Sequence, residues 1–362
     1  MEQPLPPNGA CLLGSIDISK YISNPFTEDM QFDFGKFAKN VGVFSRLLDN
    51  VVESNGLPLP EQRAEIEEKR RHGMGLTGIG STLNILGLGY GTEESLKFVE
   101  RIFQILAVES YRTGIELAKE KGCAPIFNRT FEGRSAKELW VESKFMEVVW
   151  ELAPELKEDA LKYGCRYSHA ISIAPTGTIS LTMGNNVSNG IEPSFSLSYT
   201  RNVIKTGRKA KVDERVYSYE SLLWNEVNPD KINQFPDTWV TTDELKPIDH
   251  VNIQAIAQKY VDSSISKTIN VPANIPFEDF KDVYIQAYNM GLKGCTTFRF
   301  NPEAFSGVLV KDNEMGETYY EFQLEDGSMV KAKGDDRIQY EGDEFTAQNL
   351  FDAIKEGYYG KY

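Results

Sequence analysis

The sequence predicts an α/β fold in which parallel strands alternate with helices. Apolar stretches with the length and composition of buried strands occur at residues 9–18, 73–80, 170–174, 265–271 and 295–300, and helical patterns lie between them. Strands that alternate with helices form parallel sheets joined by helical crossovers. We therefore expect about five parallel strands, which fit either an open sheet or half of a larger barrel.

The intervening helices are predicted from the spacing of apolar residues and from the residues that stop them. The predicted helices cover residues 36–54, 61–71, 93–121, 140–152, 250–266 and 276–294. The Pro-rich stretch at 56–60 separates the first two, and Gly122 stops the third. A further strand is expected at 195–204.

The sequence changes character after Pro302. Residues 318–334 alternate around Asp326-Gly327, which predicts a β-hairpin. Thr346 is placed to cap a last helix. We therefore divide the chain into residues 1–302, which hold the alternating strands and helices, and residues 303–362, a small ββα appendage.

Composition narrows the possible functions. The net charge of −14 disfavours nucleic-acid binding, because an acidic chain gains nothing from releasing phosphate counterions. No apolar run is long enough to cross a bilayer, and no secretion signal is recognisable. The four cysteines and three histidines are scattered, which argues against a bound metal and fits a reducing, cytoplasmic setting.

The strongest local signal for chemistry is APTGTIS, residues 174–180. It follows an apolar strand, and such a turn presents backbone N–H groups and hydroxyls to an anion. The alternative is an ordinary Pro-Gly turn between two elements, since Gly-rich turns are common. No Gly-Lys-Ser/Thr follows, so the stretch is not a Walker loop.

A longer stretch carries a family resemblance. Residues 174–203, APTGTISLTMGNNVSNGIEPSFSLSYTRNV, resemble the phosphate-loop region of ribonucleotide reductase catalytic subunits. Four further stretches resemble the same family in the same order, namely residues 2–19, 70–95, 250–272 and 291–303. The resemblance covers residues 2–302, and the tail from 303 to 362 matches no part of the family core.

The resemblance implies a ten-stranded α/β barrel of two five-stranded halves, with a finger loop that carries the catalytic cysteine. About five predicted strands correspond to the second half only. MEQPL at residues 1–5 is similar to the end of the finger-loop motif, which places Glu2 on its glutamate. The radical-forming cysteine would then come from an N-terminal fragment, associated or spliced, and we expect Glu2 to be ordered only beside that partner.

The resemblance also implies roles for individual residues. Glu2 corresponds to the general base near the ribose 3′-hydroxyl, and Cys11 to one thiol of the pair that reduces C2′. The other three cysteines are assigned to structure. The stretch that would bind substrate phosphates comprises Pro175, Thr176, Gly177, Thr178, Ile179 and Ser180. Supporting roles fall to Asn189, Gly190 and Glu192.

Thr296 and Thr297 point to the source of the radical. Members of the family that receive a radical from a second subunit carry two adjacent tyrosines at this place, and threonine cannot relay a radical in that way. The resemblance is therefore to the adenosylcobalamin-dependent class, in which the cofactor generates the radical. No cysteine follows Cys295, so a thioredoxin-like or other external reductant, or another chain, would re-reduce the disulfide.

The sequence thus predicts the C-terminal half of an adenosylcobalamin-dependent reductase that acts on ribonucleotides and is inactive alone. Two alternatives stay open. One is a fragment of a large subunit that depends on a separate radical subunit, against which the two threonines argue. The other is a non-catalytic nucleotide-binding or structural fragment, against which Glu2, Cys11 and the loop at 174–180 argue together.

Overall fold

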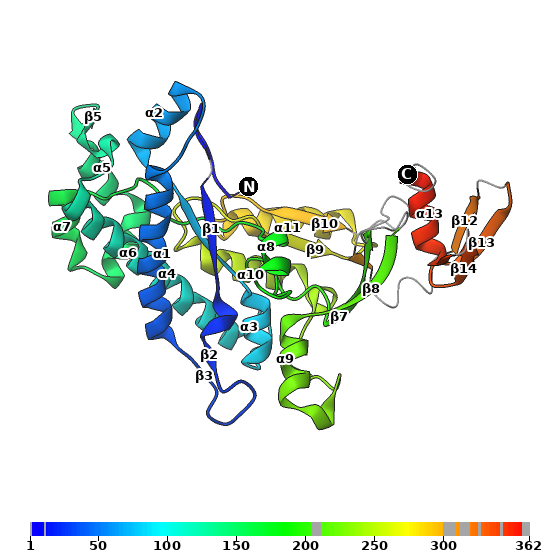
Figure 1. Ribbon diagram of the computed structural model, residues 1–362. Coiled ribbons are helices and arrows are strands. Elements are labelled where there is room, and N and C mark those ends of the chain that lie inside the picture. The colour runs from blue at the N-terminus through cyan, green and yellow to red at the C-terminus, as the bar shows by residue number, and fades with distance from the viewer. Residues whose placement is uncertain are drawn as a thin grey trace. The chain divides into compact units, whose positions relative to one another are not determined.

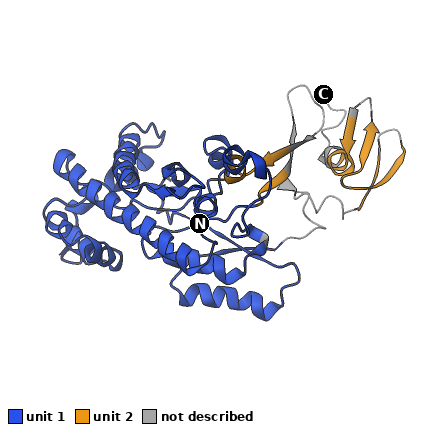
Figure 2. Cartoon of the chain, turned by 90° about the horizontal axis from the view of Figure 1, so that it is seen from below, with its two compact units in different colours: residues 1–195, 223–299 blue, residues 196–222, 300–362 orange. Residues whose placement is uncertain are grey.

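The computed structural model describes residues 2–10, 12–204, 211–299, 309–310, 319–324, 327–340 and 343–356 (Figure 1). The chain divides into two compact units, residues 1–195 with 223–299 and residues 196–222 with 300–362 (Figure 2). Residues 196–222 thus group with the C-terminal part of the chain. The boundary predicted between residues 302 and 303 stays a prediction.

Parallel strands run through the first unit. Its strands are β1 (Leu13–Asp17), β2 (Ile22–Ser23), β3 (Gln31–Phe32), β4 (Gly73–Thr77), β5 (Thr130–Phe131), β6 (Arg134–Ser135), β9 (Thr268–Val271) and β10 (Thr296–Arg299). β1 pairs with β4, and β9 pairs with β10, both in parallel. Parallel bridges from Met74 to Ile171 and from Ile173 to Ile265 continue this pairing between the two strand pairs.

The fold class is therefore α/β as predicted, but the five-strand detail is not confirmed. Residues 170–174 form isolated bridges in place of a continuous strand, and the pairings among the described residues do not close a barrel. β4 approaches this segment too closely for a side chain. A Cβ on Gly75 would lie 2.6 Å from the backbone oxygen of Ser172.

Helices cover the strands of this unit (Figure 1). Their bounds are α1 (Phe34–Glu53), α2 (Pro60–Lys69), α3 (Ile79–Ile85), α4 (Glu93–Lys121), α5 (Ala136–Val141), α6 (Lys144–Leu152), α7 (Leu156–Tyr163), α8 (Gly177–Thr182), α9 (Tyr219–Val227, which extends into the second unit), α10 (Pro247–Gln258) and α11 (Phe277–Asn289). α4 begins where Thr92 accepts a hydrogen bond from the N–H of Ser95 and ends at Gly122, as predicted.

The helix predicted at 250–266 ends eight residues early, at Gln258. Two residues after this helix instead form backbone hydrogen bonds with a distant segment, which the spacing of apolar residues cannot predict. The N–H of Ser263 donates to the carbonyl of Ile171, and the N–H of Ser266 donates to that of Ile173. Pairing with a neighbouring strand segment has therefore replaced the last turns of the helix.

The core of the first unit lies between its sheet and its long helices. α1 packs on β1 and β4, and α4 packs on α1. Fully buried residues of this core include Phe37, Met74, Leu76, Phe103 and Ile173. A smaller core holds β9 between α10 and α11, where Val251, Ile269 and Val283 are buried. This smaller core fixes which face of β9 points away from the helices.

The second unit contains strands β7 (Ser198–Ile204), β8 (Lys211–Tyr217), β11 (Leu309–Val310), β12 (Tyr319–Gln323), β13 (Met329–Lys333), β14 (Arg337–Tyr340) and β15 (Asp343–Thr346), and helix α13 (Ala347–Glu356). β7 confirms the strand expected at 195–204. β12 and β13 form the predicted hairpin, although Asp326 lies outside the described residues. The N–H of Asn349 donates to Oγ1 of Thr346, which confirms the predicted cap.

The ββα description of the tail is incomplete. A second antiparallel pair, β14 with β15, precedes α13. Its strands were missed because each has only four residues, which is too short for an alternating pattern to stand out. Phe322, Tyr340, Phe345 and Leu350 share one small core, so both hairpins and the helix are packed together. Across the described parts of the chain, no helix combines the length and apolar character needed to cross a bilayer.

Candidate functional site

The predicted phosphate-binding stretch forms a tight turn that leads into helix α8. Pro175 and residues 177–179 are exposed, whereas Thr176 and Ser180 are buried. The first hydrogen bond of this helix runs from the N–H of Ser180 to the carbonyl of Thr176, at 2.9 Å. The N–H groups of Gly177, Thr178 and Ile179 precede that bond and therefore have no acceptor within the helix.

Thr176 holds the turn in an unusual conformation. Its φ of 57° lies in the left-handed region, which a β-branched residue adopts rarely. The side chain is held from two sides. Its Oγ1 accepts a hydrogen bond from the N–H of Gly190 at 2.7 Å and lies 2.9 Å from Oγ1 of Thr77, at the end of β4. These contacts stabilise the conformation that exposes the N–H groups of α8.

The three residues predicted to give support lie beside this turn. Oδ1 of Asn189 accepts a hydrogen bond from Oγ of Ser180 at 2.6 Å, and the N–H of Gly190 binds Thr176 as described. The N–H of Glu192 donates to the carbonyl of Asn189 at 2.7 Å, which closes a turn over residues 189–192. The structure thus brings together Thr176, Ser180 and the 189–192 turn. The N–H and the hydroxyl of Ser180 are both used within the chain.

The start of α3 frames the same turn from the other side. The N–H of Ser81 donates to Oγ of Ser188, and the N–H of Ser188 donates to Oγ of Ser81, at 3.0 and 2.9 Å. The N–H of Gly78 donates to the carbonyl of Ser188 at 2.8 Å. These reciprocal bonds fix the residues before the 189–192 turn against the Gly-rich stretch at 73–80.

Glu2 lies in another part of the first unit. Its carbonyl accepts a hydrogen bond from the N–H of Ser264 at 3.0 Å. The next residue, Gln3, is buried, and its Nε2 donates to Oγ of Ser172 at 3.3 Å. These contacts hold the backbone around Glu2 within this chain, and the expectation that Glu2 is ordered only beside a partner chain stays a prediction.

Cys11 lies outside the described residues, so its predicted redox role is not placed here. Its neighbours Ala10 and Leu12 line a pocket of about 420 Å³ that also involves α1. Of the other cysteines, Cys165 is buried, and burial raises the pKa of its thiol. Cys123 and Cys295 are partly buried, and burial also raises the pKa of Cys295. A raised pKa disfavours the reactive thiolate, which fits structural roles for Cys165 and Cys295.

Sequence reasoning missed a buried lysine that contacts the site. The side chain of Lys267 is fully buried, and its Nζ donates to Oε2 of Glu192 at 2.5 Å. Thr77, which contacts Thr176, was also missed. The sequence did offer a signal for Lys267, because this lysine directly precedes the predicted strand segment TINV at residues 268–271. Thr77 carries no such signal, because it is an ordinary residue at the end of a strand.

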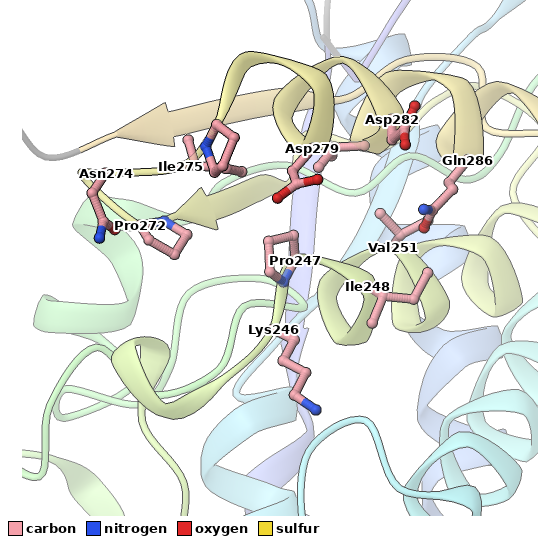
Figure 3. A pocket seen from close by; sticks show the side chains of 12 residues that line it. Lys246, Pro247, Ile248, Val251, Pro272, Asn274, Ile275, Asp279, Asp282 and Gln286 are labelled. Carbon is pink, nitrogen blue, oxygen red and sulfur yellow. The ribbon is translucent and has the colours of Figure 1, made fainter.

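A larger pocket of about 550 Å³ lies between α10 and α11 (Figure 3). Proline and aliphatic side chains line it together with Lys246, Asp279 and Asp282. None of the residues predicted from the sequence to bind substrate or to act in catalysis lines this pocket. It is therefore separate from the turn at 174–180.

Most of the chain matches a known family. A family profile described as "Ribonucleotide reductase, barrel domain" matches residues 1–298, which is most of the chain. The chain belongs to the ribonucleotide reductase family. The five stretches that resemble ribonucleotide reductases in the sequence all start inside the matched residues 1–298.

The similar reductases are longer than this chain. A protein of Thermoplasma acidophilum named "Vitamin B12-dependent ribonucleoside-diphosphate reductase" is 31% identical over 312 residues, which cover 82% of this chain and 36% of that protein. One of the same name from Mycobacterium tuberculosis strain CDC 1551 is 26% identical, covering 83% of this chain and 40% of itself. The "Vitamin B12-dependent ribonucleotide reductase" of Streptomyces coelicolor is 24% identical, covering 86% and 36%. The chain thus spans 36–40% of the length of these reductases.

Proposed function

We propose that this chain forms the C-terminal part of the catalytic barrel of an adenosylcobalamin-dependent ribonucleotide reductase, which converts ribonucleotides to 2′-deoxyribonucleotides. The observation that carries the proposal is the 31% identity over 312 residues with a reductase whose name states its dependence on vitamin B12. The geometry at 174–192 supports it, because that turn offers an anion site of the kind that a nucleotide substrate needs.

In this proposal the substrate's phosphates bind at the start of α8. Gly177, Thr178 and Ile179 are exposed residues, and their N–H groups have no acceptor within the helix. Pro175 and Thr176 shape the turn, and Ser180 fixes it to Asn189. Because backbone N–H groups do the binding, an apolar side chain is acceptable at Ile179.

The inner face of β9 and β10 fits a radical source inside the barrel. Ile269 and Val271 point into the small core with α10 and α11, so by strand alternation Thr268 and Asn270 point to the opposite face. The register pairs Thr296 with Thr268, which places Thr296 on that inner face. Oγ1 of Thr297 instead lies 2.8 Å from the hydroxyl of Tyr284 on α11. Thr296 therefore puts a small hydroxyl, which cannot relay a radical, where the cofactor would lie.

Adenosylcobalamin, when bound, supplies the radical that a catalytic cysteine uses. The inner-face side chains of this chain that would border it are Thr268, Asn270, Thr296 and Phe298, of which Thr296 and Phe298 are exposed. Glu2 would accept the proton of the 3′-hydroxyl, and Cys11 would be one of the two thiols that reduce C2′. We assign re-reduction of that disulfide to an external thioredoxin-like reductant in the cytoplasm.

The rest of the barrel, including the radical cysteine, would come from an N-terminal half, either as a separate polypeptide or joined to this one. Strand β10 supports this part of the proposal. Three of its four residues are exposed, whereas strands of parallel sheets are normally covered on both faces. Phe298 of this strand is among the exposed large hydrophobic side chains.

Reconstitution tests the proposal. The chain is mixed with an N-terminal barrel half of this family, adenosylcobalamin, a dithiol reductant and a ribonucleoside diphosphate or triphosphate, and deoxyribonucleotide is measured by chromatography. We expect turnover with the pair and none with either part alone. A Cys11→Ser variant should lose multiple turnover, whereas Cys123→Ser should retain it.

Three other outcomes contradict parts of the proposal. Turnover that needs a separate radical subunit, and not cobalamin, would favour the alternative of a radical-subunit-dependent reductase. Tight binding of the two parts with no turnover under either condition would favour a non-catalytic fragment. Multiple turnover in the Cys11→Ser pair would remove Cys11 from the redox pair.

A further inference from the structure

The strongest unassigned feature of the first unit is the buried ammonium group of Lys267. Its Nζ donates hydrogen bonds to Oε2 of Glu192 at 2.5 Å and to the carbonyl of Thr268 at 2.8 Å, and lies 2.9 Å from Nδ1 of His250. An ammonium group has three donors, and these three partners use all of them. A fully buried charge is tolerated only when it is paired and hydrogen-bonded in this way.

His250 accepts from this ammonium as a neutral imidazole. Burial, and next the positive charge of Lys267, lower the pKa of His250 to about 2. Burial also lowers the pKa of Lys267, and the nearby carboxylate of Glu192 opposes that shift. The charges of this group are therefore one cation and one anion, namely the fully buried Lys267 and the partly exposed Glu192.

Glu192 connects this ion pair to the turn at 189–192. Its second oxygen, Oε1, accepts a hydrogen bond from the N–H of Thr268 at 2.6 Å. Both carboxylate oxygens are thus held at the start of β9. The same residue closes the turn through its own N–H, which donates to the carbonyl of Asn189. The position of the turn is consequently set by β9, some 75 residues further along the chain.

The 189–192 turn holds the candidate phosphate-binding residues at two points. Asn189 accepts from the hydroxyl of Ser180, and Gly190 donates to Oγ1 of Thr176. Thr176 occupies the left-handed region only because the surrounding contacts hold it there. A continuous path of hydrogen bonds therefore runs from Lys267 through Glu192 and the 189–192 turn to Thr176 and Ser180, which flank residues 177–179.

We propose that Lys267 and Glu192 are positioning residues for nucleotide binding, which hold the start of α8 in its anion-binding conformation through the 189–192 turn. This rests on the proposed function only for the identity of the ligand. The coupling itself is a property of the fold and can be measured without substrate. A structural role confined to stability would leave the turn intact in any variant that still folds.

Amide hydrogen exchange of the full chain tests the coupling. In the wild-type protein, the N–H of Gly190 and the N–H of Thr268 should exchange through one shared opening, with equal opening constants and equal dependence on low urea. Glu192→Gln keeps the size and one acceptor of the side chain, and should speed exchange at Gly190 by about 10-fold, because a hydrogen bond to a charged group is lost. Lys267→Met should have the same effect.

Lys259→Met provides the matched control, because Lys259 is an exposed lysine on the same stretch of chain. It should leave exchange at Gly190 unchanged. If the N–H of Gly190 exchanges as slowly in a folded Glu192→Gln or Lys267→Met variant as in the wild-type protein, the proposal is wrong. If both variants fail to fold, unequal opening constants for Gly190 and Thr268 in the wild-type protein would overturn it, and equal constants would support it.

Inorganic pyrophosphate separates this inference from the proposed function. We expect it to shift the amide resonances of residues 177–179 in the wild-type chain, with affinity about 10-fold weaker in Glu192→Gln. If pyrophosphate leaves those resonances unchanged in the wild-type protein, the phosphate-site assignment fails, while the exchange result still decides the coupling. If it binds the wild-type chain and the folded Glu192→Gln variant equally, the positioning role is wrong.

Discussion

The backbone N–H of Gly190 donates a hydrogen bond to Oγ1 of Thr176 at 2.7 Å. The two residues belong to separate turns, and this contact fixes the side chain of a residue whose backbone is in the left-handed region. The shape of residues 174–180 therefore depends on a neighbouring turn as much as on its own sequence.

Replacing the hydroxyl of Thr176 should weaken the fold. Thr176→Val keeps the shape of the side chain but leaves the buried N–H of Gly190 without its acceptor, which should cost about 1–3 kcal/mol of unfolding free energy. Thr176→Ser keeps the hydroxyl and should lie close to the wild type. Urea unfolding followed by circular dichroism measures both, and equal stabilities for the two variants would contradict the assigned contact.

The carboxylate of Asp49 should be the most sensitive charge in the first unit. It is fully buried, and Nη2 of Arg70 and Nε of Arg166 lie 2.7 and 3.2 Å from its oxygens. Asp49→Asn leaves the two buried guanidinium groups with only the half-exposed carboxylate of Glu53 as an anion. The loss of the buried charge should cost roughly 3 kcal/mol of unfolding free energy.

The exposed pair of Arg46 with Glu120 provides the control for Asp49. Both side chains are about half exposed, and water already solvates them well. Glu120→Gln should therefore leave the urea midpoint nearly unchanged. A comparable loss in both variants would indicate that burial does not govern the contribution of these charges.

Stability should fall in mild acid because of His72. The side chain is fully buried, and desolvation lowers its pKa to about 4 from an ordinary value of 6.5. As pH falls through 6.5, the unfolded chain takes up a proton that the folded chain excludes, so stability decreases until the folded pKa is reached. The loss from this group is on the order of 3 kcal/mol between those values.

Substitution of His72 tests whether this residue causes the loss of stability in mild acid. Nδ1 of His72 donates to the carbonyl of Ala170, and His72→Asn retains a donor near that position without an ionisable group. The slope of unfolding free energy against pH between 4.5 and 6.5 should decrease by up to one proton equivalent. An unchanged slope would show that other groups cause the acid sensitivity.

Gly80 should tolerate no side chain. A Cβ there would lie 2.6 Å from the backbone oxygen of Glu192 and 2.8 Å from the backbone of Pro193. Since backbone atoms cannot rotate away, Gly80→Ala should cost about 1–3 kcal/mol and displace the 189–192 turn. Gly56→Ala meets no atom within 4 Å and should be neutral or slightly stabilising. Thermal unfolding of the two variants compares them directly.

Local sequence determined much of the fold and part of the site. The bounds of α4 follow from Thr92 and Gly122, because caps act within one turn of the helix that they terminate. The turn at 174–180 was recognisable because proline fixes φ and glycine permits turn conformations, both of which act locally. The helix predicted at 250–266 failed at its end for the opposite reason, since distant strand residues compete for its N–H groups.

Only the tertiary structure decided what surrounds that turn. Glu192 is an ordinary residue before a proline in the sequence, and Lys267 is a lysine beside an apolar stretch. Their ion pair, the burial of Gln3 against Ser172, and the pairing of Thr296 with Thr268 all depend on segments far apart in the chain. Residue patterns determine local conformation and family, whereas burial and pairing arise when distant segments exclude water from one another.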